Sequence, residues 1–171
     1  MSPWHLQGSA TFTIGQRSVE GIKAQNEDAI GIRIPDDLLL TTKGAVAIIA
    51  DGVSASEAGK EASETCVHNF LSDYYSTPET WSVGKSTGQV LTALNRWLYS
   101  QGRQFADAQK GYLTTLSAIV FKSHAAHLLH VGDSRIYRLR NNTLEQLTRD
   151  HTHCLLNTCY ATDKQTTCRT S

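Results

Sequence analysis

Alternation of apolar and polar residues predicts most of the strands in this chain. Ile30, Ile32 and Ile34 recur at every second position, which places them on one face of a strand. Residues 45 to 50 read Ala-Val-Ala-Ile-Ile-Ala, a short apolar run that is typical of a buried strand. We therefore predict strands at about residues 9 to 15, 28 to 34, 45 to 50, 115 to 122, 125 to 131, 135 to 140 and 144 to 147, with Asn141-Asn142 as the last turn.

Two stretches between the third and fourth predicted strands have helical spacing instead. Small or apolar side chains recur every four residues in 56 to 74, and a broader apolar stripe follows in 86 to 104. The positions are Ala58, Ala62, Cys66 and Phe70 in the first stretch and Val90, Leu91, Leu94, Trp97 and Leu98 in the second. Because these helices are grouped between antiparallel strands, we expect an α+β fold, an antiparallel β-sandwich flanked by helices.

Acidic residues stand at the ends of three of the predicted strands. The group comprises Glu27, Asp28, Asp51 followed by Gly52, and Asp133, with Lys23 as a neighbouring cation. Carboxylate and carbonyl oxygens are the ligands that hard divalent cations such as Mg²⁺ prefer. Each turn alone is also typical of an ordinary hairpin or a solvated loop. Three such turns in one small chain favour a metal site.

Five short motifs in a fixed order resemble the bacterial metal-dependent protein phosphatases of type 2C, also called PPM-type. The motifs are Lys23-x-x-Asn26-Glu27-Asp28, Ala50-Asp51-Gly52 with Gly59, Ala62 and Ser63 after it, Thr114-Thr115-Leu116, His130-Val131-Gly132-Asp133-Ser134-Arg135, and Leu147-Thr148-Arg149-Asp150-His151. The resemblance covers about residues 9 to 152. It is greatest to the phosphatase part of bacterial proteins that join such a domain to a protein kinase.

The resemblance implies a binuclear Mg²⁺ or Mn²⁺ centre that hydrolyses phosphoserine or phosphothreonine in a protein, with the cognate kinase as a partner. Asp51 matches the carboxylate that contacts both ions, and Gly52 matches the position whose carbonyl binds one of them. Glu27 and Asp28 match acidic positions that hold metal-bound water. Asp133 matches an aspartate associated with a third, weaker ion.

Three departures from the family pattern bear on activity. Lys23 stands where the family has an arginine that contacts the substrate phosphate, and an ammonium lacks the bidentate fork of a guanidinium. Residues 53 to 56 read Val-Ser-Ala-Ser and supply no histidine that could protonate the leaving group. The family completes its first ion site with aspartates in a Ser-Asp-Gly turn and an Asp-Asn pair, which this sequence does not reach. We therefore expect a C-terminally truncated domain.

The composition changes after residue 152. Residues 153 to 171 lack apolar periodicity beyond Leu156 and are dense in threonine and cysteine. We expect residues 1 to 152 to be the N-terminal portion of the phosphatase domain and residues 153 to 171 to be an aberrant or disordered tail. A zinc site in this stretch is the alternative, although its spacing is irregular. Its ligands would be His151, His153, Cys154, Cys159 and Cys168.

Charge and hydropathy argue against other classes of partner. The 171 residues include 16 basic and 16 acidic side chains, and this balance gives no basis for binding nucleic acid or an anionic membrane. No apolar run approaches the length of a membrane span, and the N-terminus lacks the pattern of a signal peptide. A cytoplasmic protein is the expectation.

Two functional hypotheses follow from these observations. The first is a metal-dependent protein serine/threonine phosphatase that is incomplete in this chain. The second is a non-catalytic binding or regulatory fragment, a pseudophosphatase that keeps the fold and turns over no substrate. Metal-dependent hydrolysis that requires Asp51 distinguishes the first from the second.

Overall fold

Strands and helices occupy most of the chain that the structure describes. The computed structural model describes residues 11–54, 56, 58–105 and 111–151, together with the backbone of residues 166–169. In chain order the elements are β1 (Asp28–Arg33), α1 (Asp37–Lys43), β2 (Ala45–Asp51), α2 (Gly59–Ser76), α3 (Val83–Gly102), β3 (Leu116–Lys122), β4 (Ala125–Val131), β5 (Tyr137–Arg140), β6 (Thr143–Gln146) and β7 (Thr166–Arg169).

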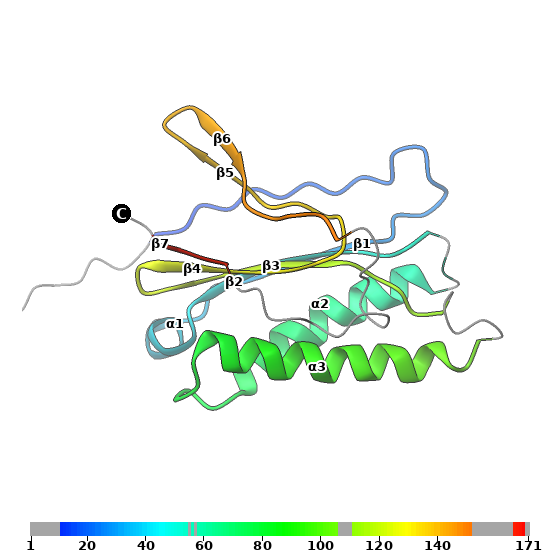
Figure 1. Cartoon of the computed structure of the whole chain (residues 1–171), viewed down its shortest axis with the longest axis horizontal. Coiled ribbons are helices and arrows are strands. Elements are labelled where there is room, and N and C mark those ends of the chain that lie inside the picture. Colours follow the sequence, from blue (N-terminus) through cyan, green and yellow to red (C-terminus); the bar gives the residue numbers. More distant parts are fainter. Residues whose placement is uncertain (1–10, 55, 57, 106–110, 152–165, 170–171) are drawn as a thin grey trace, which may run out of the picture.

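Five strands form one antiparallel sheet in the order β1-β2-β3-β4-β7. The helices α2 and α3 lie together against one face of this sheet (Figure 1). The pairing of β1 with β2 sets Asp28 opposite Asp51 and Ile30 opposite Ile49. The predicted α+β class, with an antiparallel sheet and flanking helices, is confirmed, and the register brings acidic residues of two strands to one end of the sheet.

The hydrophobic core lies between the sheet and these two helices. Ile48 of β2 and Val120 of β3 are at most 1% exposed, and Phe70 of α2 and Leu98 of α3 are fully buried. Burial of each such side chain contributes about 1.5–3 kcal/mol to folding. Trp97, which the sequence places on the same apolar stripe as Leu98, lies at the edge of that stripe and is 37% exposed. The helical faces predicted from spacing are therefore the faces that pack.

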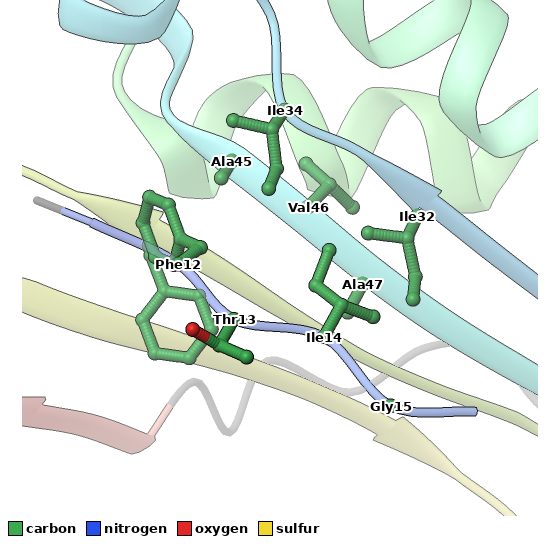
Figure 2. A pocket seen from close by; sticks show the side chains of 10 residues that line it. Phe12, Thr13, Ile14, Gly15, Ile32, Ile34, Ala45, Val46 and Ala47 are labelled. Carbon is green, nitrogen blue, oxygen red and sulfur yellow. The ribbon is translucent and has the colours of Figure 1, made fainter.

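The N-terminal segment crosses the opposite face of the sheet (Figure 1). Residues 11–15 form no strand, so the strand predicted at 9 to 15 is wrong for the described part of that range. A strand needs the free edge of a neighbour, whereas this segment lies over the face of β3, with the Phe12 and Phe121 rings 5.6 Å apart. A cavity of about 320 Å³ lies between the segment and the sheet, lined by residues that include Ile14 and Ile32 (Figure 2).

The strands β5 and β6 form a separate hairpin on the same side of the sheet as the N-terminal segment (Figure 1). Asn141 and Asn142 connect them with φ values of 49° and 62°. A two-residue turn of type I′ requires positive φ at both positions, and asparagine adopts that conformation more readily than most residues. The turn predicted at Asn141-Asn142 is therefore confirmed.

The apolar pattern does not predict two of the elements. The first, α1, follows Pro35-Asp36 and is closed by Gly44 with φ of 81°, but its seven residues are too few to show a helical period. The second, β7, falls within residues 153 to 171 and pairs with β4. The remainder of that stretch, including the zinc candidates His153, Cys154 and Cys159, lies outside the described residues, so the boundary at 152 stays a prediction.

None of the helices in the described part of the chain combines the length and the apolar character that a membrane crossing requires.

Candidate active site

Two carboxylates face each other where β1 begins and β2 ends. The antiparallel register makes Asp28 and Asp51 direct partners, and their side chains share a hydrogen bond. The pKa of Asp51 is raised, first by burial and then by the charge and the hydrogen bond of Asp28. Two carboxylates this close cannot both ionise without strong repulsion. A bound cation would relieve that repulsion.

Gly52 sits in a space that only a glycine can fill. Its N–H donates a 3.0 Å hydrogen bond to the Glu27 carbonyl, and a Cβ at position 52 would collide with the carbonyl oxygen of Gly59. Ser63 of α2 donates its hydroxyl to the same Glu27 carbonyl at 2.5 Å. The end of β2 is thus pressed between the loop before β1 and the start of α2.

Lys23 brings a positive charge to this group of acids. Its Nζ lies 4.0 Å from Glu27 Oε2, and the Lys23 side chain is 50% exposed whereas that of Glu27 is 16% exposed. The positive charge of Lys23 acts to lower the pKa of Asp51, against the larger effects that raise it. Lys23 is therefore close enough to act on the carboxylate pair and remains accessible from solvent.

Two threonines directly before β3, Thr114 and Thr115, hold the backbone of Asp51. Thr115 N–H donates to the Asp51 carbonyl at 2.9 Å, and Asp51 N–H donates to Thr115 Oγ1 at 3.1 Å. The Thr114 hydroxyl donates to the same Asp51 carbonyl at 3.0 Å. The sequence places these threonines in one of the five motifs but assigns them no role in the site. The signal that could have revealed one is a polar, β-branched pair directly before a buried apolar strand.

Asp133 enters the site from the turn that follows β4. It is exposed, and its negative charge contributes to the raised pKa of Asp51. The next residue, Ser134, lies with its Oγ 2.9 Å from Thr115 Oγ1. Arg135 then pairs with Asp150, its Nη2 lying 2.6 Å from Oδ2. The turn is therefore tied both to β3 and to the segment after β6.

The six residues singled out in the sequence gather at one end of the sheet. They are Lys23, Glu27, Asp28, Asp51, Gly52 and Asp133. Within the described ranges, however, no three His, Cys, Asp or Glu side chains converge closely enough to hold a metal ion. The arrangement is an oxygen-rich acidic cluster with one nearby cation.

Comparison with known proteins identifies the family. The family model for Protein phosphatase 2C matches residues 16–170. This chain belongs to the protein phosphatase 2C family. The serine/threonine phosphatase Stp of Listeria welshimeri is 35% identical to it over 151 residues, which cover 80% of this chain and 54% of that protein. The chain thus spans about half the length of these curated relatives.

Solved structures of protein phosphatase 2C relatives agree with the fold. The serine/threonine phosphatase PstP/Ppp of Mycobacterium tuberculosis matches at a TM-score of 0.60 and 29% identity, covering 77% of this chain and 51% of that one. Stp1 of Staphylococcus aureus matches at a TM-score of 0.71 over 95% of this chain and 75% of that one. Its 18% identity supports the fold alone.

Phosphatases of the 2C family depend on divalent metal ions, and the residues at the end of this sheet fit part of such a centre. The donor atoms are oxygens, as Mg²⁺ and Mn²⁺ prefer. The pKa of Asp51 is raised first by burial and then by Asp28, and the positive charge of Lys23 acts in the opposite direction. The described residues therefore offer oxygen donors of the kind that a divalent cation binds.

Proposed function

We propose that this chain carries part of the centre of a metal-dependent protein serine/threonine phosphatase. The observation that carries the proposal is the Asp28–Asp51 pair, two carboxylates whose repulsion a cation would relieve. Two Mg²⁺ or Mn²⁺ ions, with a third bound more weakly, would supply an activated water and neutralise phosphoryl oxygens. The family and the names of its relatives support the same reaction.

Each residue of the cluster has a distinct task in this proposal. Asp51 is the shared carboxylate, and the Gly52 carbonyl is a second ligand beside it. Glu27 and Asp28 orient water, while Asp133 belongs to the third, weaker ion site. Lys23, with half of its side chain exposed, contacts the phosphate of the substrate. Its single ammonium charge can bind a phosphoryl oxygen but cannot form the paired hydrogen bonds of an arginine.

The proposed substrate is a phosphoprotein. The Listeria relative is named a serine/threonine phosphatase, which supports phosphoserine and phosphothreonine as the groups that are hydrolysed. The kinase that makes these groups is then the opposing enzyme in the same signalling reaction. A cytoplasmic location is part of the proposal, because protein kinases draw on the cytoplasmic pool of ATP.

One observation favours a second candidate, a non-catalytic binding or regulatory fragment. No three candidate ligand side chains in the described ranges converge on one ion. A centre with a partial ligand set binds its ions weakly and positions water poorly. The experiment that follows separates this candidate from the phosphatase.

Titration calorimetry with Mn²⁺ tests the site directly. We expect weak binding by the parent, loss of binding in Asp51→Asn, and no change in the control Asp73→Asn, which alters an exposed aspartate of α2. The asparagine keeps the size of the side chain and removes the charge that a hard cation needs. Equal heats for the parent and Asp51→Asn would show that the assignment of the site is wrong.

A chimaera tests the reaction. Residues 1–151 of this chain would be followed by the corresponding C-terminal part of the Listeria phosphatase, which supplies the aspartates that the family uses downstream. We expect Mn²⁺-dependent release of phosphate from a phosphothreonine peptide, reduced by at least about a hundredfold in Asp51→Asn. Mn²⁺ binding that requires Asp51, without turnover by the chimaera, would favour the non-catalytic fragment.

A further inference from the structure

The side chain of Thr115 contacts two separate parts of the acidic cluster. Thr115 directly precedes β3 and is 3% exposed. Its Oγ1 accepts a 3.1 Å hydrogen bond from the N–H of Asp51 and lies 2.9 Å from the Oγ of Ser134. One hydroxyl therefore joins the last residue of β2 to the turn that presents Asp133.

The turn also packs against the carbon atoms of the same threonine. Gly132 has φ of 109°, and a Cβ built there would lie 2.7 Å from Thr115 Cγ2. A side chain at position 132 would therefore push the turn away from β3. Two contacts of Thr115 therefore fix the position of the turn relative to the end of β2. Its methyl group packs against the backbone of Gly132, and its hydroxyl contacts Ser134.

The Thr115 hydroxyl is a direct side-chain link between the end of β2, which carries Asp51, and the turn that carries Asp133. Two further contacts hold the flanks of the turn: Ser117 Oγ donates to Ser134 O at 3.4 Å, and His151 N–H donates to Gly132 O at 2.8 Å. Of these contacts, only the Thr115 hydroxyl also binds Asp51.

We propose that Thr115 is a positioning residue that sets the spacing between the carboxylates of Asp51 and Asp133 and thereby the affinity of the centre for divalent ions. The inference rests on the proposed metal site. Residues that orient metal ligands through hydrogen bonds typically change metal affinity by about 10- to 100-fold when they are replaced. The proposal adds a residue that binds no ion and no substrate itself.

Two substitutions separate the hydroxyl of Thr115 from its shape. Thr115→Val keeps the methyl group against Gly132 but leaves the Asp51 N–H and the Ser134 hydroxyl without their shared partner. Thr115→Ser keeps the hydroxyl and gives up the methyl contact. The matched control is Thr87→Val, because Thr87 is also buried and donates its hydroxyl to Val83 O at 2.8 Å within α3.

Titration calorimetry with Mn²⁺ alone measures the effect on the 171-residue chain. We expect the dissociation constant to rise about tenfold in Thr115→Val, by less than about threefold in Thr115→Ser, and to stay unchanged in Thr87→Val. Ser134→Ala should weaken binding as Thr115→Val does and add nothing to it in the double variant. Full additivity of the two changes, or unchanged affinity in Thr115→Val, would overturn the proposal.

Amide hydrogen exchange in metal-free protein tests the link independently of any ion. We expect the amides of residues 132–134 to exchange at least about tenfold faster in Thr115→Val and in Ser134→Ala than in the parent or Thr87→Val. If Asp51→Asn leaves Mn²⁺ binding unchanged, the proposed function fails while this measurement still decides the link. Should Thr115→Val fail to fold, Ser134→Ala gives the same decision, and an unchanged exchange rate in that variant overturns the link.

Discussion

A charged side chain lies at each end of β2, buried at one end and partly buried at the other. Just before the strand, Lys43 is 1% exposed, and its ammonium donates to Thr77 Oγ1 at 2.6 Å and to the Pro78 carbonyl at 2.9 Å. At the other end, Asp51 shares a hydrogen bond with the carboxylate opposite it. The ammonium donates to two neutral oxygens, whereas the carboxylate shares its hydrogen bond with a second acid.

The difference separates a buried charge that serves the fold from a partly buried charge that a ligand could compensate. Burial and then the positive charge of Lys122 lower the pKa of Lys43, but the carbonyl oxygen and the threonine hydroxyl accept hydrogen bonds from its ammonium. The pKa of Asp51 is raised by burial and by Asp28 together, and Lys23 offsets this only in part. A group that is kept in an unfavourable environment marks a place where stability has been given up, which is typical of binding and catalytic sites.

The largest expected effect is at the Lys43 end. Replacing Lys43 with alanine removes a buried side chain and two hydrogen bonds, so we expect the free energy of unfolding to fall by about 3 kcal/mol. Urea denaturation followed by circular dichroism measures the change. Lys85→Ala is the control, because Lys85 is exposed and lies over the Trp81 ring at 4.3 Å, a contact that contributes about 0.5–1 kcal/mol.

Lys43→Met then tests whether the charge itself has a role beyond the fold. Methionine keeps most of the buried chain and loses the ammonium, so part of the stability should return while Mn²⁺ binding stays at the parent value. A change in Mn²⁺ affinity would contradict the assignment of Lys43 to the fold alone, since it would show that the two ends of β2 are coupled.

At the Asp51 end we expect the opposite sign. Asp51→Asn removes like-charge repulsion from the pair with Asp28, so the metal-free protein should be more stable by about 0.2–1 kcal/mol. The same urea denaturation, run in a chelator, measures this gain. A loss of stability in Asp51→Asn would mean that the carboxylate contributes to the fold in the way Lys43 does.

The dependence on pH sharpens this prediction. The pKa of Asp51 lies above its ordinary value of 3.8 in the folded protein, so the folded state binds the proton more tightly than the unfolded chain does. The contribution of Asp51 to stability is therefore lost as pH rises from 3.8 through the raised pKa. We expect the advantage of Asp51→Asn over the parent to be greatest above that pKa and to vanish below 3.8. An advantage that persists at low pH would exclude repulsion as its cause.

Much of the fold could be predicted from the sequence because the strands and helices have clear apolar periods. The run before Asp51 and the stripe around Leu94 both became core elements. The predictions failed where strand pairing decides whether a segment forms a strand, or where an element is too short to show a period. Residues 11–15 alternate like a strand but lie over the face of the sheet, and α1 has only seven residues.

The acidic residues of the candidate site could be predicted from the sequence, but the residue that positions them could not. Asp28 and Asp51 stand at strand ends in the sequence, and the antiparallel register places them opposite each other. The role of Thr115 could not be read in the same way, because its partners Asp51 and Ser134 are 64 and 19 residues away along the chain. Contacts of that range depend on how the strands pair, which local patterns do not specify.

The smallest expected effect concerns β7, which pairs with β4 at the Lys43 end of the sheet. Deleting residues 152–171 removes a four-residue edge strand and leaves the pairing of β1 to β4 intact. We expect the free energy of unfolding to change by at most about 0.5 kcal/mol and Mn²⁺ affinity to stay the same. Amides of β4 that lose their partners should exchange faster with solvent, while those of β2 should not. A loss of more than about 2 kcal/mol would show that β7 belongs to the domain and that the boundary at residue 152 is wrong.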